Sequence, residues 1–161
     1  MYYSQKKFDE AILINNDSLY NLVLNGDGTN LGMLDMIDEY GGTNAANLAA
    51  YYSGMIYLKM NDYQNSIKYL SEFNSDDMIL GSLATGSIGD AFAELNQFED
   101  AYEYYVKASK NNNSYTSPIY LFKAGLIAMK LEKFKKAEGY FSSIKSDYSK
   151  SAESKNIDAY I

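Results

Sequence analysis

The sequence predicts an all-α protein, an α-solenoid of antiparallel helix pairs that wind into a right-handed superhelix. Three observations support this prediction. Three stretches repeat the same anchor residues in the same order, beginning at Gly54, Gly89 and Gly125, with steps of 35 and 36 residues. Pro118 is the only proline among 161 residues, so long helices meet few breaks. Apolar residues make up 47% of the chain, which is enough for a packed core.

Each repeat combines small residues, which let two helices approach closely, with large residues that fill the seam beside them. From each glycine, the other anchors follow at offsets of +3, +7, +9, +12 and +16. The three sets are Gly54, Tyr57, Asn61, Tyr63, Ser66 and Leu70; Gly89, Phe92, Asn96, Phe98, Ala101 and Tyr105; and Gly125, Ala128, Glu132, Phe134, Ala137 and Phe141. A helix–turn–helix unit of about 34 residues is the signature of the tetratricopeptide repeat (TPR), which these stretches resemble.

The residue seven positions after each glycine is expected to end the first helix of the pair in the left-handed conformation. Asparagine tolerates this conformation, so Asn61 and Asn96 suit their positions. Glu132 departs from the pattern, and we therefore expect the third turn to differ in detail.

Helix-capping residues indicate the boundaries of the repeats. Thr43 or Asn44 can cap the first repeat, and Asp77 can face the positive end of the next helix. Ser117 supplies a capping hydroxyl, and Pro118 would follow it at the first helical position. The predicted single domain spans 1–161, with degenerate N-terminal helices in 1–42 (near 2–15, 18–24 and 31–40), repeats at 44–74, 77–111 and 117–148, and a capping helix at 150–161.

The capping helix is expected to close the exposed end of the solenoid. Ser149 or Ser151 can start it. Its apolar residues Ile157, Tyr160 and Ile161 recur at i, i+3 and i+4, which places them on one side of a helix.

The composition argues against an enzyme, a metal centre and a nucleic-acid-binding protein. Histidine and cysteine are absent, which removes the common zinc ligands, thiol nucleophiles and imidazole bases. The chain has 14 lysines, no arginine and 21 acidic residues, and its net charge of −7 opposes binding to a polyanion. The segment 25–30 lacks the glycine and glutamate spacing of a calcium loop, so we expect a plain turn there. No cofactor is expected.

The first helices of a TPR solenoid line its concave surface, which makes a groove for a protein or peptide the leading candidate site. The predicted groove residues are Tyr51, Met55 and Lys59 in the first repeat, Gly86, Asp90 and Glu94 in the second, and Phe122, Leu126 and Lys130 in the third. They predict an apolar and aromatic surface with an acidic centre flanked by two lysines. Some TPR domains clamp the C-terminal carboxylate of chaperones with Lys, Asn and Arg side chains. The corresponding positions here are Tyr51, Met55, Gly86 and Asp90, so that activity is expected to be absent.

The first helix of the second repeat has unusually small side chains around Gly86, including Gly81, Ser82 and Ala84. Either its neighbours pack very close to it, or the groove deepens there and admits a ligand. We hypothesise the second arrangement.

Several segments are more specific than a generic TPR. They are residues 24–28, 37–43, 48–54, 88–91, 118–125 and 157–161. Together they resemble membrane-anchored extracytoplasmic TPR proteins of Gram-negative bacteria, a family related to the YfgM-type ancillary subunit of the Sec translocon. The resemblance implies an N-terminal membrane helix outside this chain, a soluble periplasmic fragment, and contacts with translocon components, chaperones or emerging chains. It offers no catalytic motif.

The favoured function is therefore a non-enzymatic scaffold or adaptor that binds a protein or peptide in the cell envelope. Two alternatives remain open. The repeats could form a self-associating structural module, or the protein could handle glycans, because Tyr51, Tyr52 and Phe122 could stack on sugars.

Overall fold

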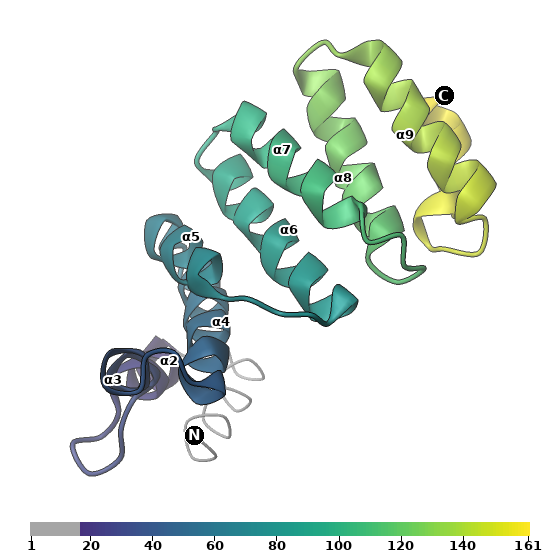
Figure 1. Cartoon of the computed structure of the whole chain (residues 1–161). Helices are drawn as coiled ribbons and strands as arrows, with labels where there is room; N and C mark the ends of the chain where they lie inside the picture. The colour runs from purple at the N-terminus through teal and green to yellow at the C-terminus, as the bar shows by residue number, and fades with distance from the viewer. Residues whose placement is uncertain (1–16) are drawn as a thin grey trace. The chain divides into compact units, whose positions relative to one another are not determined.

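The computed structural model describes residues 17–161, in which helices are joined by short loops (Figure 1). No strand occurs within these residues. The helices group into two compact units, one ending at Asn74 and the other beginning at Ser75, and each is described by itself. The predicted helix near 2–15 lies outside the described residues, and the single domain of 1–161 stays a prediction.

The first unit holds the helices that lead into the first repeat and the repeat itself. They are α2 (Asp17–Asn25), α3 (Met33–Glu39), α4 (Asn44–Lys59) and α5 (Tyr63–Glu72). The helices α2 and α3 form where the sequence predicted helices near 18–24 and 31–40. Tyr20, Leu24 and Met33 are almost completely buried and belong to one core with Ile56 of α4. The irregular N-terminal helices thus cover one side of the first repeat.

The second unit contains two helix pairs and a short C-terminal helix. These are α6 (Met78–Glu94), α7 (Phe98–Ser109), α8 (Ser117–Lys130), α9 (Phe134–Asp147) and the 3₁₀ helix η1 (Glu153–Tyr160). Each of α6 to α9 packs against the next in chain order (Figure 1). Tyr105 and Ala108 of α7 share a core with Tyr120 and Ala124 of α8, so this core joins the second repeat to the third.

The predicted glycine seams, which are the close contacts between the two helices of each pair at the repeat glycine, are confirmed. In each helix pair, the residue 16 positions after the glycine packs directly on the glycine backbone, at the place where a Cβ atom would stand. The pairs are Gly54 with Leu70, Gly89 with Tyr105, and Gly125 with Phe141. A Cβ on Gly54 would lie 2.5 Å from the Leu70 Cγ, and one on Gly89 would lie 2.8 Å from the Tyr105 ring. Such distances are shorter than van der Waals contact, so the seams require glycine.

The predicted caps are confirmed for α4 and α6, whereas the start of α8 differs. The side chains of Thr43 and Asp77 accept hydrogen bonds from backbone N–H groups in the first turns of α4 and α6. The hydroxyl of Ser117 instead accepts a hydrogen bond from the backbone N–H of Asn113, at 3.0 Å. Ser117 is already the first residue of α8, so Pro118 occupies the second helical position and no side chain caps this helix.

All three turns within the helix pairs have the same backbone geometry. Asn61, Asn96 and Glu132 adopt φ angles of 61°, 59° and 58°. In each turn, the next backbone N–H donates to the carbonyl five residues earlier, with distances of 2.9, 2.9 and 2.8 Å. The expectation that the third turn differs was wrong, because these hydrogen bonds involve only the backbone and form despite the poorer preference of glutamate for this conformation.

Replacing Glu132 by Asn is expected to raise the free energy of unfolding by about 0.5–1 kcal/mol, because Asn tolerates positive φ better than a longer side chain does. Thermal denaturation should show a midpoint about 1–4 °C higher. The matched control, Asn96→Glu, should lower the midpoint by a similar amount. An unchanged or lower midpoint for Glu132→Asn would contradict the prediction.

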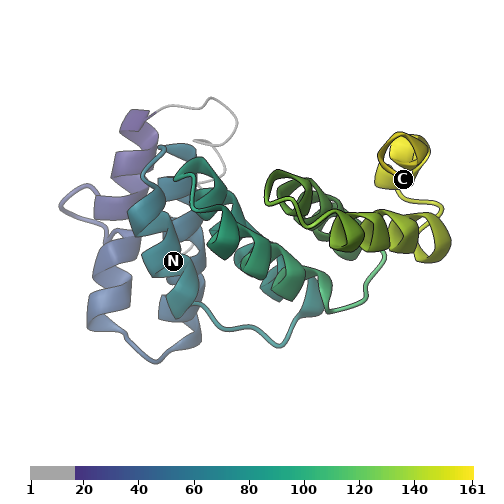
Figure 2. The same ribbon diagram turned by 90° about the horizontal axis from the view of Figure 1, so that it is seen from above.

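The C-terminal element differs from the predicted α-helical cap. Residues 153–160 form the 3₁₀ helix η1, which lies beside α9 (Figure 2). Asn156 interrupts it with non-helical angles of φ −124° and ψ 18°. Ile157 is buried, as the sequence predicted, but Tyr160 is 38% exposed and Ile161 is 52% exposed. The prediction assumed an α-helix with 3.6 residues per turn, whereas a 3₁₀ helix has three, so Ile157 and Tyr160 share one side and Ile161 does not.

Candidate functional site

The first helices of the two repeats in the second unit, α6 and α8, carry six of the predicted groove residues. Contacts between Gly86 and Tyr120 and between Asp90 and Lys123 bring these two helices together. Lys123 and Tyr120 were not among the predicted site residues.

Asp90 is the centre of a polar cluster that joins α6, α7 and α8. Its carboxylate accepts hydrogen bonds from the Lys123 ammonium, at 2.6 and 2.9 Å, and from the Tyr105 hydroxyl, at 2.7 Å. The Lys123 Nζ atom also lies 5.5 and 5.7 Å from the ring centroids of Tyr105 and Tyr120, within cation–π range. The acidic centre expected from the sequence is therefore balanced by a lysine of the neighbouring repeat.

The sequence contained a weak signal for this ion pair. Asp90 and Lys123 have opposite charges and lie on the first helices of adjacent repeats, 33 residues apart. Adjacent first helices lie side by side in a helical-repeat stack, so opposite charges one repeat apart are candidates for pairing. The choice among several possible lysines depends on the side-chain positions.

The environment of Tyr105 raises its pKa well above the ordinary value of 10.0. Burial is the largest cause, and the charge of Asp90 and the hydrogen bond to its carboxylate act in the same direction. The folded protein consequently binds the phenolic proton more tightly than the unfolded chain does. This contribution to stability is complete below pH 10 and is lost as the pH rises from 10 toward the raised pKa.

Replacing Tyr105 by Phe is therefore expected to make stability less sensitive to alkaline pH. Between about pH 10 and pH 12, the slope of unfolding free energy against pH should become shallower by up to about 1.4 kcal/mol per pH unit, which corresponds to one proton. Urea denaturation at several pH values measures both slopes. Equal slopes for the variant and the wild type would show that Tyr105 does not contribute this dependence.

Gly86 is a packing residue, and the hypothesis that it deepens a groove was wrong. Gly86 is buried, and a Cβ atom there would overlap the Tyr120 ring of α8. Tyr120 is itself 4% exposed and stacks on Tyr105, with an interplanar angle of 17°. The small side chain thus admits an aromatic ring of the same protein, which is the other arrangement that the sequence had left open.

The apolar face of α8 contains two of the predicted groove residues, Phe122 and Leu126, together with Met129. Phe122, Leu126 and Met129 lie at i, i+4 and i+7, so they share one side of the helix. Leu126 and Met129 are 38% and 41% exposed, and Phe122 is half-buried. The Lys130 Nζ atom lies 3.8 Å from the ring centroid of Phe98 on α7, so this lysine also has an internal partner. We refer to Phe122, Leu126 and Met129 as the α8 apolar face.

The predicted groove residues of the first unit differ in their exposure to solvent. Tyr51 is buried, with its ring 5.1 Å from the Phe73 ring and 5.4 Å from the Tyr52 ring. Met55 is half-buried against the core of the first unit, and Lys59 is exposed near the end of α4. Tyr51 is thus a packing residue, and the expectation that its ring lies on the surface was wrong.

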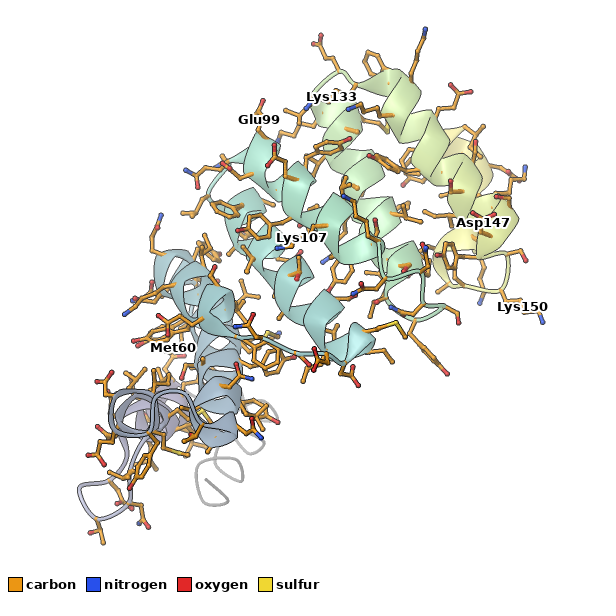
Figure 3. All side chains as sticks on the ribbon, in the orientation of Figure 1. Met60, Glu99, Lys107, Lys133, Asp147 and Lys150 are labelled. Carbon is orange, nitrogen blue, oxygen red and sulfur yellow. The ribbon has the colours of Figure 1, made fainter. Side chains whose placement is uncertain are left out.

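The second helices of the last two repeats are joined by another tyrosine cluster. The hydroxyls of Tyr102 on α7 and Tyr140 on α9 form a hydrogen bond of 2.7 Å. The Nζ atoms of Lys133 and Lys136 lie 4.6 and 5.7 Å from the centroid of the Tyr102 ring, and Lys133 precedes α9 at the turn (Figure 3). Burial raises the pKa of Tyr140, and its hydrogen bond with Tyr102 acts in the same direction because the neutral Tyr140 hydroxyl can donate to the Tyr102 oxygen. These contacts involve the protein's own groups and hold α7 and α9 together.

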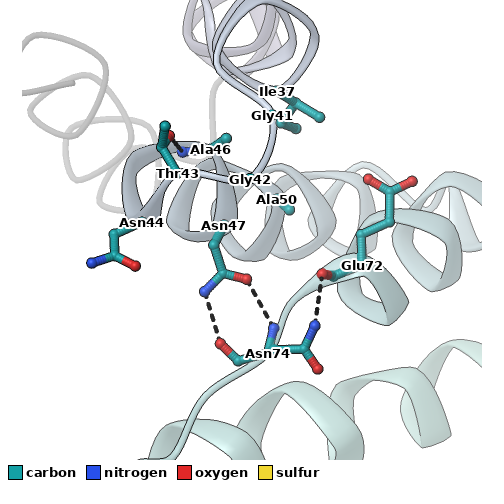
Figure 4. A pocket seen from close by; sticks show the side chains of 10 residues that line it. All are labelled: Ile37, Gly41, Gly42, Thr43, Asn44, Ala46, Asn47, Ala50, Glu72 and Asn74. Carbon is teal, nitrogen blue, oxygen red and sulfur yellow. Dashed lines mark hydrogen bonds between the residues drawn. The ribbon is translucent and has the colours of Figure 1, made fainter.

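A cavity of about 480 Å³ in the first unit was not predicted. It lies between the loop at 41–43, the start of α4 and the end of α5 (Figure 4). The Asn47 side chain donates to the Asn74 carbonyl at 2.7 Å and accepts from the Asn74 N–H at 2.9 Å. The two asparagines close a hydrogen-bonded ring that holds the end of the repeat on α4, so the polar groups at this wall have a structural role.

Residues 17–161 contain no group of three or more His, Cys, Asp or Glu side chains that could hold a metal ion. Within the same residues, no helix has both the length and the apolar composition needed to cross a lipid bilayer.

Comparison with known families decides the type of fold. Residues 48–76 match the family model of the tetratricopeptide repeat. The fold is a TPR-type helical fold. The match covers most of α4 and all of α5, and the TPR glycine seam and turn recur in the two helix pairs of the second unit. A comparison with curated proteins found no match. TPR domains generally mediate protein–protein interaction and are typically non-catalytic scaffolds.

Proposed function

We propose that the protein is a non-enzymatic scaffold that binds a protein or peptide through the α8 apolar face. The observation that supports this proposal most strongly is the exposure of Leu126 and Met129, one helical turn apart and in line with Phe122. Apolar side chains at i, i+4 and i+7 that remain open to solvent are the usual contact pattern for an apolar segment of a partner.

The charged residues near this face have a supporting role in the proposal. Lys123 pairs with Asp90, and Lys130 lies over the Phe98 ring, so these groups already have partners within the second unit. They orient α8 against its neighbours. The partner is consequently expected to contact mainly apolar side chains, and its affinity should depend only weakly on salt.

The test is affinity capture from cells of the source organism, with the wild-type chain and a Leu126→Glu/Met129→Glu variant as baits. A partner that the wild type captures and the Leu126→Glu/Met129→Glu variant does not capture would support the proposal, provided that the control below retains it. The matched control is Met78→Glu/Ile79→Glu, which adds the same charges at two other exposed apolar residues of the second unit. Equal capture by all three folded baits would exclude the α8 apolar face as the site, and recovery of the bait alone would favour self-association.

We further propose that the protein acts in the cell envelope, on the extracytoplasmic side of the inner membrane. The support is the sequence resemblance to anchored TPR proteins, and translocon subunits or envelope chaperones are the proposed partners. Protease treatment of intact cells and of spheroplasts tests the location. Digestion in spheroplasts with protection in intact Gram-negative cells is the expected result, and protection in both would contradict it.

A further inference from the structure

The 3₁₀ helix η1 covers an aromatic surface of α8 and α9 with only two large side chains. Ile157 is 1% exposed and belongs to one core with Phe141 and Ile144. The Tyr160 ring lies 5.3 Å from the Phe122 ring and 5.1 Å from the Phe141 ring, measured between centroids. Because Ile157 and Tyr160 are three residues apart, one helical turn presents both side chains to this surface.

The remaining interactions of η1 are weak. A 3₁₀ helix has poorer hydrogen-bond geometry than an α-helix and seldom extends beyond three or four residues, and Asn156 interrupts η1 in its middle. The ion pair between Lys145 and Asp158 is exposed, with 58% and 75% of the two side chains accessible to solvent. Exposed ion pairs contribute little to stability. The docking of η1 therefore depends mainly on Ile157 and Tyr160.

Phe122 belongs both to the surface under η1 and to the α8 apolar face. Its ring makes an edge-to-face contact with Tyr160, at an interplanar angle of 85°. A partner that covers the whole α8 apolar face must therefore meet the Tyr160 ring. The partner therefore either packs beside η1 or displaces it from this surface.

We propose that the surface formed by Phe122, Phe141 and Ile144 is a peptide-binding site that η1 occupies in the free protein. The site takes a helical segment with a branched aliphatic residue followed, three positions later, by an aromatic residue. Such a segment makes the contacts of Ile157 and Tyr160, and it displaces η1 when it binds. The inference rests on the proposed function in one respect only, namely that the segment belongs to the partner of the α8 apolar face.

The test is a synthetic peptide of residues 149–161, labelled with a fluorophore and titrated with the full chain. In a full-chain Ile157→Ser/Tyr160→Ser variant, η1 lacks both anchors and the site is open. This variant should bind the peptide at least about tenfold more tightly than the wild type, because binding to the wild type must first displace η1. A peptide with the same two substitutions is the matched control and should not bind.

Two results would overturn the inference. Either the open variant does not bind the peptide, or the wild type binds it equally well, in which case η1 does not occupy the site. Circular dichroism of the open variant establishes that it is folded before the titration.

Hydrogen exchange of the wild type gives a second test that needs no variant. If η1 detaches as a unit, the amides of residues 154–161 should exchange at least about 100-fold faster than those in the middle of α9. Equal protection of the two segments would show that η1 is a fixed part of the fold. The two proposals can fail separately. If the peptide binds the open variant but the Leu126→Glu/Met129→Glu bait still captures the partner, the proposed function is refuted and the peptide-binding site is supported.

Discussion

Replacing Gly86 by Leu is expected to lower the free energy of unfolding by about 3 kcal/mol or more. The new side chain would enter the space of the Tyr120 ring, and overpacking of a close-packed core typically costs about 1–3 kcal/mol and occasionally more. The ring cannot swing away freely, because it is buried and stacks on Tyr105. Thermal and urea denaturation measure the loss, and the expected decrease of the midpoint is about 6–12 °C.

The matched control for Gly86→Leu is Gly139→Leu in α9. A Cβ atom at Gly139 would meet no other atom within 4 Å, so the control should raise stability by about 0.5–1 kcal/mol through helix propensity alone. A double-mutant cycle between Gly86→Ala and Tyr120→Leu identifies the cause, because the smaller side chain at 120 should remove most of the cost at 86. A stable Gly86→Leu variant would restore the interpretation of Gly86 as part of an open groove.

Replacing Phe141 by Ala is expected to cost about 3–5 kcal/mol, the usual range for a fully buried phenylalanine. Phe141 is 0% exposed, and its ring packs on the Gly125 backbone and on the rings of Phe122 and Tyr160. Its removal leaves a cavity between α8 and α9 and weakens the contact that holds η1. The variant should unfold at a clearly lower urea concentration than the wild type.

The matched control is Phe141→Leu, which keeps most of the apolar contact and should lose roughly half as much stability or less. Hydrogen exchange adds a measurement specific to η1, since residues 154–161 should lose protection in Phe141→Ala before α6 and α7 do. A loss below about 1 kcal/mol for Phe141→Ala would contradict the central role of this residue in the seam.

Much of the local fold could be predicted because its causes lie within one helix pair. A glycine and the residue 16 positions later meet whenever two helices are joined by a turn of fixed geometry. The same reasoning located the left-handed turns at Asn61 and Asn96. Even the exception at Glu132 shows the strength of the local geometry, because the backbone hydrogen bonds impose the turn on a residue with a poor preference for it.

The prediction of the site was less accurate than that of the fold, because it assumed that equivalent positions of a repeat have equivalent environments. Tyr51 and Gly86 occupy repeat positions that were expected to line the groove, yet both are buried. Large neighbours cover them: Phe73 lies against Tyr51, and Tyr120 lies against Gly86. Leu126, by contrast, is exposed, as its position in the repeat predicted.

The sequence by itself determined the helix pairs, their turns and their glycine seams, since these depend on spacing within about 20 residues. Only the tertiary structure decided which side chains meet between repeats. Lys123 pairs with Asp90, Tyr120 covers Gly86, and Tyr160 contacts Phe122. These contacts depend on rotamers and on residues outside the repeating pattern, so no period in the sequence specifies them. They also determine how much of the surface remains open to a partner.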